Sequence, residues 1–448
     1  MPGGVGLNIQ WRHLALVSAL TATTALTAAA PVSAETRGNI SIVSYSSSDP
    51  SITVEVGESI SRVRERFSEA GSVEIGGTAS PAVGIKPSPS GGESGAPPQR
   101  VPNVAAGSTA GITGIVDFNA CRANPDAGVR EGKIVSRYDF CRYQTIYSIA
   151  VSASGQTLGT ISFLQTEVTT GSNGTREVLS SVEITDIRYS GVYTAASQIQ
   201  TYRAAGTGTN DPECAVSGGT NPYTATAAQL QGNGFLGMNI TSPPTVGDGD
   251  DKIKVCNIQW FYKIFFPAGT YPTQWLSGGF STVRFDSASY LPSKQGVVFS
   301  ELTPTMTMSM SDTRVKGVAQ HINQAFTDPG STLPVKSDNS PKVIPGNARQ
   351  GSTLSRLYSG ANPLAAQAYA DNRSAVSRAC APLPHAPLEE CDEFPFASTW
   401  EGAGVGNGNF SVKYVSATEN SNAGYDLANF YSSQRILHND KFKVLITP

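Results

Sequence analysis

Four long segments alternate between apolar and polar residues, and this pattern constrains the fold more than any other feature of the sequence. They cover residues 144–152, 160–168, 177–189 and 253–266. A period of two is typical of strands that bury one face, and polar, glycine-containing turns between such strands favour antiparallel pairing. We therefore predict that residues 109–315 form a β-rich antiparallel domain with a sandwich-like architecture.

The N-terminus has the pattern of a secretory signal peptide. Within residues 1–34, Arg12 is the one Lys or Arg side chain, and an apolar stretch over 14–30 is followed by small residues up to Ala34. The stretch is short for a membrane span and has no basic flank after it, so we expect cleavage rather than anchoring. The sequence thus predicts a secreted, extracellular protein whose mature form does not engage a membrane.

All six cysteines of the chain follow the predicted signal. They are Cys121, Cys141, Cys214, Cys256, Cys380 and Cys391. An even number of cysteines in an exported chain points to disulfide bonds, because an oxidising environment preserves them. Loop closure costs least between neighbours along the chain. We therefore expect the pairs 121–141, 214–256 and 380–391.

The region between the signal and the β-rich domain differs in composition. Glycine, proline, serine and alanine dominate from residue 68 onward, which is typical of a linker. We predict that residues 35–108 form a flexible N-terminal segment and linker, with a strand at 51–56 and a helix at 58–67.

Helical spacing of apolar residues returns after the β-rich domain. It is seen at 315–326, 353–358 and 363–381, and short strands and a further helix follow. We place a second domain at 316–448, which makes the chain a multidomain α+β protein.

Several functional classes find no support. The formal net charge of −3 excludes a strongly basic protein, so nucleic-acid binding would require a local patch of cations. Neither a GxSxG elbow nor an HExxH pair is present, which excludes the corresponding serine hydrolases and zinc proteases. His321, His385 and His438 lie far apart in the sequence, and we expect none of them to be catalytic.

A cluster of acidic residues carries the strongest functional signal. Glu389, Glu390, Asp392 and Glu393 lead directly into an aromatic and proline-containing segment, and Glu401 follows. Acidic side chains that enter an apolar segment must be paired, hydrogen-bonded or bound to a cation. Because few basic residues lie nearby in sequence, a hard divalent cation is a reasonable partner.

The residues after the acidic cluster predict a strand at 410–416 and a helix with Asn420 near its start. This order can bring a carboxylate and an amide oxygen onto one cation. Asp392 and Glu393 are adjacent, so on a regular strand they point to opposite faces. Both could serve one site only if the strand bends or Pro395 interrupts it.

This segment resembles the NucA/NucB family of secreted bacterial deoxyribonucleases. The resemblance rests on the run from Cys391 through Asp392-Glu393-Phe394-Pro395 to Thr399, on Glu401-Gly402, and on Glu419-Asn420 with Gly424. It covers roughly the last 110–130 residues. It implies a small ββα-metal nuclease-like domain that hydrolyses DNA phosphodiester bonds with one divalent cation, most simply Mg²⁺ or Mn²⁺.

The resemblance also implies roles for individual residues. Asp392 would be the general base that activates water, Glu401 and Asn420 would be metal ligands or their immediate supports, and Glu393 would assist catalysis. The reverse assignment, with Asp392 as a ligand and Glu401 as the base, stays open. Phosphate contacts would come from cations, and the candidates are Arg373, Arg378 and Lys413.

The sequence therefore favours a secreted metal-dependent endonuclease that acts on DNA. Two alternatives remain open: an exported β-rich binding protein with a catalytically silent C-terminal domain, or a nuclease toxin. In each case we expect that the β-rich domain could bind a protein or glycan partner.

Overall fold

The computed structural model describes residues 40–75, 117–206, 211–267, 275–338 and 340–448. The predicted signal peptide and most of the predicted linker lie outside these residues. Within them, no helix is long and apolar enough to cross a membrane. The combination of helices with antiparallel sheets makes this an α+β protein, as expected.

The first sheet of the β-rich part has eight strands. Seven follow one another across the sheet, and β3 pairs with β4 beside them. In spatial order they are β2 (Val73–Glu74), β1 (Ile40–Ser47), β4 (Asp139–Ser152), β5 (Thr157–Thr170), β7 (Glu177–Tyr189), β11 (Phe235–Thr241) and β9 (Ala215–Ser217), with β3 at Lys133–Ile134. Every pair in this sheet is antiparallel, as the alternation predicts.

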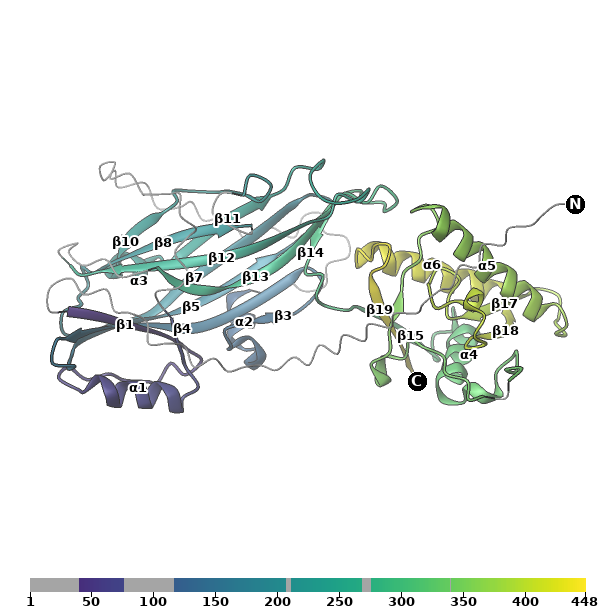
Figure 1. The fold of residues 1–448 in the computed structure, drawn as a ribbon, viewed down its shortest axis with the longest axis horizontal. Coiled ribbons are helices and arrows are strands. Elements are labelled where there is room, and N and C mark those ends of the chain that lie inside the picture. The colour runs from purple at the N-terminus through teal and green to yellow at the C-terminus, as the bar shows by residue number, and fades with distance from the viewer. Residues whose placement is uncertain (1–39, 76–116, 207–210, 268–274, 339) are drawn as a thin grey trace, which may run out of the picture. The chain divides into compact units, whose positions relative to one another are not determined.

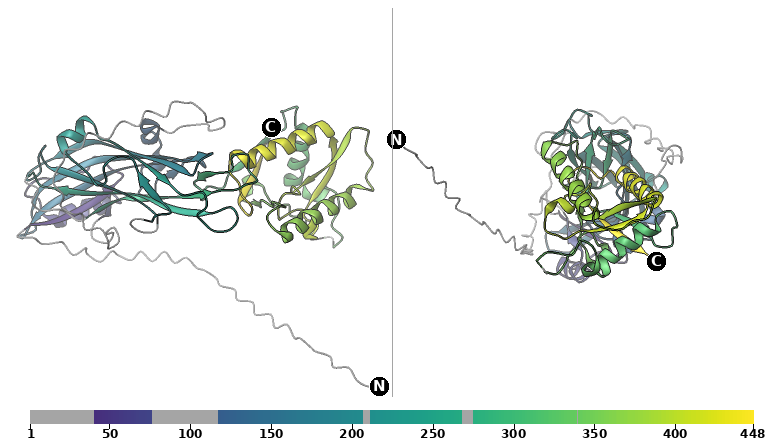
Figure 2. Two further views of the ribbon diagram at one scale, coloured as in Figure 1. Left: turned by 90° about the horizontal axis from the view of Figure 1, so that it is seen from above. Right: turned by 90° about the vertical axis from the view of Figure 1, so that its right-hand side faces the viewer.

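The second sheet has six strands and shares a hydrophobic core with the first. In spatial order they are β10 (Tyr223–Thr226), β8 (Gln198–Ala205), β12 (Lys254–Phe265), β13 (Leu276–Asp286), β14 (Gly296–Val298) and β6 (Ser172–Asn173). Trp260 of β12 is fully buried and donates a hydrogen bond to Ser180 Oγ of β7 at 3.0 Å. The two sheets thus form a sandwich, and Figures 1 and 2 show its long strands running in roughly one direction.

The N-terminal segment is part of this sandwich, which corrects the prediction of a flexible segment for its first half. β1 pairs with β4 over its whole length, whereas no strand forms at 51–56. Helix α1 (Ile60–Glu69) covers β1 and β4, because Phe67 stacks on Tyr45 at 4.2 Å between ring centroids and meets Tyr147 edge-on at 4.9 Å. The predicted helix at 58–67 is therefore present as α1, and burial of these rings orders a segment that we expected to be flexible.

The predicted disulfides are confirmed. Cys121 on the short helix α2 (Phe118–Arg122) is bonded to Cys141 on β4. The second bond joins the residue before β9 to β12, and the third joins α5 to β17, as Cys214–Cys256 and Cys380–Cys391. Helix α3 (Ala227–Gly232) completes the helices of the β-rich part.

The C-terminal part has its own core of buried side chains from two of its three helices and from two small sheets, and the third helix packs in a separate cluster with Phe410 and Val412. The helices are α4 (Lys316–Thr327), α5 (Pro363–Cys380) and α6 (Ala417–Ser433). The strands are β15 (Thr305–Ser309), β16 (Leu354–Ser355), β17 (Glu389–Phe394), β18 (Ser411–Ser416) and β19 (Lys441–Thr447). Short 3-10 helices of this part lie at Pro329–Ser331, Ala348–Gln350 and Ala403–Val405, and another lies at Pro125–Ala127 in the β-rich part. The right-hand view of Figure 2 shows the green and yellow helices around these short strands.

Two expectations for this part are wrong in detail. The predicted helix at 353–358 is instead the short strand β16, because Leu354 pairs with Phe442 of β19 and is fully buried there. β15 lies before the predicted boundary at residue 316, yet it pairs in parallel with β19 and so belongs to the C-terminal sheet. The division of the chain into these domains otherwise stays a prediction.

Buried ion pairs connect the sandwich to the segment between α6 and β19. Arg435 is fully buried and pairs with Asp286 at the end of β13, with its Nε donating to Oδ2 at 3.1 Å. Asp440 accepts hydrogen bonds from Arg284 at 2.6 and 2.8 Å and from Arg137 at 3.2 Å. Because an unpaired charge is costly in such surroundings, these contacts hold the end of α6 in place.

We predict that Asp440→Asn destabilises the protein and removes part of its acid sensitivity. Burial alone would raise the pKa of Asp440, but the charges and hydrogen bonds of Arg284 and Arg137 lower it below its ordinary value. A lowered carboxyl pKa stabilises the fold above about pH 4 and loses that contribution as the pH falls through the folded-state pKa. At neutral pH the variant should lose about 3 kcal/mol, since two arginines lose their counter-charge.

Urea unfolding of both proteins between about pH 7 and pH 3 measures this effect. The gap in unfolding free energy should narrow below about pH 4. A gap of constant size over the whole range would contradict the assignment.

Candidate active site

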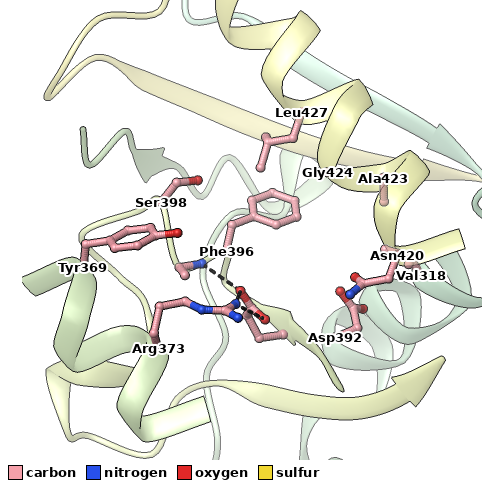
Figure 3. A pocket seen from close by; sticks show the side chains of 12 residues that line it. Val318, Tyr369, Arg373, Asp392, Phe396, Ser398, Asn420, Ala423, Gly424 and Leu427 are labelled. Atoms are coloured by element: carbon pink, nitrogen blue, oxygen red, sulfur yellow. Dashed lines mark hydrogen bonds and ion pairs between the residues drawn. The ribbon is translucent and has the colours of Figure 1, made fainter. Parts of the chain in front are cut away.

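A cavity of about 230 Å³ lies in the C-terminal part, between α5, α6 and the end of β17. Its wall is formed by Val318, Tyr369, Arg373, Asp392, Glu393, Phe396, Ala397, Ser398, Asn420, Ala423, Gly424 and Leu427. Figure 3 shows Tyr369 and Arg373 on one side of the cavity and Asp392 and Asn420 on the other. Part of the wall is apolar, and the polar groups that converge on it are few.

The sheet geometry explains how two adjacent acids reach one cavity. β17 pairs only with β18 in the described part of the chain, so one edge of β17 is unpaired. Asp392 contacts His321 on α4, whereas Glu393 contacts Arg373 on α5, so the two side chains do leave opposite faces of the strand. The cavity lies at the end of this strand, where side chains from both faces line its wall.

Asp392 is buried and held by one strong contact. Its residue is 6% exposed, and its Oδ2 lies 2.6 Å from Nδ1 of His321. Among the described residues, no donor contacts its second oxygen, Oδ1. The carboxylate therefore has one oxygen fixed in the protein interior and one available to the cavity.

Glu393 is paired with a cation instead. Arg373 Nη1 lies 3.1 and 3.3 Å from its two oxygens, and the backbone N–H of Ala397 donates to Oε1 at 3.4 Å. Burial raises the pKa of Glu393, and the positive charge of Arg373 opposes that rise only in part. Arg373 is 54% exposed, so the cation of this pair faces solvent.

The first turn of α6 contributes an amide to the cavity. Asn420 Nδ2 donates to Glu390 Oε2 at 3.1 Å, which directs the amide oxygen away from that carboxylate. Glu419 beside it accepts from the backbone N–H of Gly317 at 2.5 Å, and so ties α6 to the start of α4. These contacts fix the orientation of Asn420.

Glu401 does not join this cluster, and we correct the prediction that it is a metal ligand or catalytic residue here. It is absent from the cavity wall, and its Oε2 accepts a hydrogen bond from the backbone N–H of Ser355 at 2.9 Å. The carboxylate therefore holds the end of β16 against the loop after β17. Proximity to Asp392 in sequence does not bring it close in the fold, because the chain turns through Pro395 and Trp400.

The predicted phosphate-binding cations are separated in the same way. Arg373 lines the cavity, whereas Arg378 and Lys413 are exposed and do not. Lys413 lies opposite Asp392 in the register of β17 and β18.

Two buried connections fix α5 beside the cavity. The disulfide between Cys380 and Cys391 ties the end of the helix to β17. Earlier in the helix, Asn372 donates to the carbonyl oxygens of Ala397 and Thr399, both at 2.9 Å. Since Arg373 is the next residue, its backbone position follows from these bonds.

A comparison with protein families finds one match in this region. Residues 359–445 match the family model of deoxyribonuclease NucA/NucB. The resemblance seen in the acidic motif is thereby confirmed for the C-terminal part of the chain. No curated protein and no solved structure matches the chain.

The matched NucA/NucB segment contains most of the cavity wall, including Asp392, Glu393 and Asn420. Helix α4 precedes the match, so His321 and Val318 come from outside it. The cavity therefore depends on residues upstream of the segment that the family model covers.

The oxygen atoms of the cavity wall are of the type that hard divalent cations bind. No group of three or more His, Cys, Asp or Glu side chains in the described ranges could hold a metal ion, which argues against a closed protein cage. The oxygens that face the cavity, from Asp392 and Asn420, are hard ligands. Mg²⁺ suits such a sparse oxygen set, because it keeps several waters and takes few protein ligands beside substrate phosphates.

Sequence reasoning missed His321, which directly contacts the central carboxylate. It also missed the aromatic part of the wall, formed by Tyr369 and Phe396. A buried histidine on the apolar face of a predicted helix was the available signal, since His321 lies between Val318 and Ile322 on α4.

Proposed function

We propose that this protein is a secreted, metal-dependent endonuclease that hydrolyses phosphodiester bonds of DNA. One observation carries the proposal: within a NucA/NucB-matching segment, one cavity brings together a buried, oriented carboxylate, an oriented amide and an exposed arginine. These three groups are Asp392, Asn420 and Arg373. They supply a base, a hard oxygen ligand and a phosphate contact, which phosphodiester hydrolysis requires.

Asp392 is the general base in this proposal. Its Oδ1 accepts a proton from a water molecule, whose oxygen attacks the phosphorus atom. The bond from phosphorus to the 3′ oxygen breaks, and that oxygen takes a proton from solvent. The products carry a 5′-phosphate and a 3′-hydroxyl.

Asn420 would hold the divalent cation through its amide oxygen, with waters and a phosphate oxygen as further ligands. A bound Mg²⁺ or Mn²⁺ would stabilise the charge that develops on the phosphate. Strands β17 and β18 with the following helix α6 would then form the ββα-metal unit of the domain. Glu390 keeps the amide in the orientation that such a ligand needs.

Arg373 would contact a phosphate of the substrate. In the free protein it pairs with Glu393, which keeps the guanidinium at the cavity wall. A phosphate offers the same two-oxygen acceptor geometry as that carboxylate, so the arginine can grip it without moving far. The role of Glu393 is then to position Arg373 rather than to bind the cation.

Secretion is supported by the three disulfides and by the sequence pattern of residues 1–34. The β-rich sandwich would bind a protein or glycan partner outside the cell. Its role does not enter the chemistry proposed here.

We predict that Asp392→Asn lowers the rate of DNA hydrolysis by about 10²- to 10⁴-fold, because the amide cannot accept the proton of water. Plasmid nicking by the purified mature protein measures the effect. EDTA should stop cleavage, and added Mg²⁺ or Mn²⁺ should restore it. Asp371→Asn is the matched control, because Asp371 is exposed on α5 and its carboxylate accepts a hydrogen bond from Gln367 outside the cavity. Cleavage by Asp392→Asn in the presence of EDTA would overturn the proposed function.

We predict that Arg373→Ala weakens DNA binding and reduces the salt dependence of binding by about one unit of log–log slope. The physical reason is the loss of one phosphate contact at the cavity. Titration of labelled DNA with the protein at several salt concentrations, with Ca²⁺ in place of Mg²⁺, measures this slope. Arg378→Ala on the same helix should leave the slope unchanged, and an equal effect of both variants would argue against a specific role for Arg373.

A further inference from the structure

A buried histidine lies directly behind the proposed base. His321 is 1% exposed, and its Nδ1 lies 2.6 Å from Asp392 Oδ2. Its other ring nitrogen, Nε2, lies 2.6 Å from Ser411 Oγ, and this serine is fully buried on β18. A continuous chain of hydrogen bonds therefore runs from the protein interior to the carboxylate in the cavity.

We propose that His321 is a positioning residue for Asp392, which deepens the proposed function and rests on it. The contact fixes Oδ2 in the interior, so the carboxylate cannot rotate and Oδ1 is presented to the cavity. A base held in one orientation loses less of its efficiency to unproductive geometries. Hydrogen bonds behind a reacting group commonly contribute a large part of its activity.

The chemistry of the carboxylate determines which atom donates in the hydrogen bond between His321 and Asp392. An ionised carboxylate only accepts hydrogen bonds, so His321 Nδ1 must carry the proton in that contact. Ser411 can then donate to Nε2 of the neutral ring, or accept from it if the ring is charged. The donor toward Asp392 is the same in both cases.

The same geometry excludes two other roles for these residues. The order Ser–His–Asp resembles a nucleophilic triad, but Ser411 is fully buried and does not line the cavity. His321 does not line the cavity either, so it has no access to substrate or attacking water. The proton taken from water passes to Asp392, which releases it to solvent before the next turnover, and His321 keeps its own proton throughout.

His321 comes from α4, which precedes the matched segment at 359–445. The helix is tied to the site a second time, because Gly317 N–H donates to Glu419 beside Asn420. The proposal therefore assigns α4 to the catalytic unit rather than to the framework alone.

Two isosteric variants separate a positioning role from a packing role. In His321→Asn the amide nitrogen takes the place of Nδ1 and can still donate to Asp392. In His321→Gln the amide takes the place of Nε2, so the variant keeps the contact with Ser411 and loses the donor to Asp392. We expect His321→Gln to reduce kcat for DNA cleavage by about 10- to 100-fold with little change in KM. We expect His321→Asn to stay close to the unmodified protein.

The melting temperature of each variant is measured alongside, and His385→Gln at an exposed histidine serves as the control. A kcat that falls equally in both His321 variants, or that follows the melting temperature, would overturn the positioning role. The Asp392→Asn variant distinguishes failure of the positioning role from failure of the proposed function. If that variant is inactive and the two His321 variants behave alike, the inference fails while the proposed function stands. If Asp392→Asn retains full activity, the proposed function itself fails.

A measurement that leaves His321 in place covers the case in which the His321 variants do not fold. Protein with ¹⁵N-labelled histidine should show, for His321, an N–H proton on Nδ1 that exchanges slowly with solvent and shifts in Asp392→Asn. Absence of such a proton, or a signal that Asp392→Asn leaves unchanged, would overturn the proposal.

Discussion

A carboxylate removed from water has to be hydrogen-bonded, and this constraint organises the C-terminal part of the protein. Asp392 is hydrogen-bonded to Nδ1 of His321, and the other ring nitrogen of His321 is hydrogen-bonded to Ser411. The three residues lie on β17, α4 and β18, so one polar chain links a helix to both strands of a small sheet. The position of the cavity beside Asp392 follows from this arrangement.

The acidic residues between Glu389 and Glu393 have different roles in the structure. Glu389 accepts from the backbone N–H of Ala386 at 2.7 Å and shapes the turn before β17. Glu390 orients Asn420, and Glu393 holds Arg373. Asp392 alone keeps an oxygen toward the cavity without a protein donor among the described residues. A dense acidic run can thus support one reacting carboxylate without forming a metal cage.

Four long strands of the sandwich, β4, β5, β7 and β12, and the three disulfides were predictable because their signals are local. Period-two alternation identified β7 with both of its ends, and neighbouring cysteines along the chain are indeed bonded. The short motif around Asp392 identified the family of the C-terminal segment. In each case the decisive residues lie close together in the sequence.

The failures share a physical cause, since each depends on contacts between distant segments. β1 is ordered by pairing with β4, about a hundred residues later along the chain. Glu401 is close to Asp392 in sequence, but the chain directs it toward Ser355. His321 reaches Asp392 across 71 positions, and its place on the apolar face of a predicted helix does not show which residue it contacts.

The central claim is that a hard cation binds in this cavity, between Asp392 and Asn420, and assists hydrolysis there. Anomalous diffraction from crystals of the mature protein soaked in Mn²⁺ tests it most directly. The account predicts one strong peak within coordination distance of the Asn420 amide oxygen, on the side that faces Asp392. A peak beside Glu401 and Ser355, with none in the cavity, would contradict it.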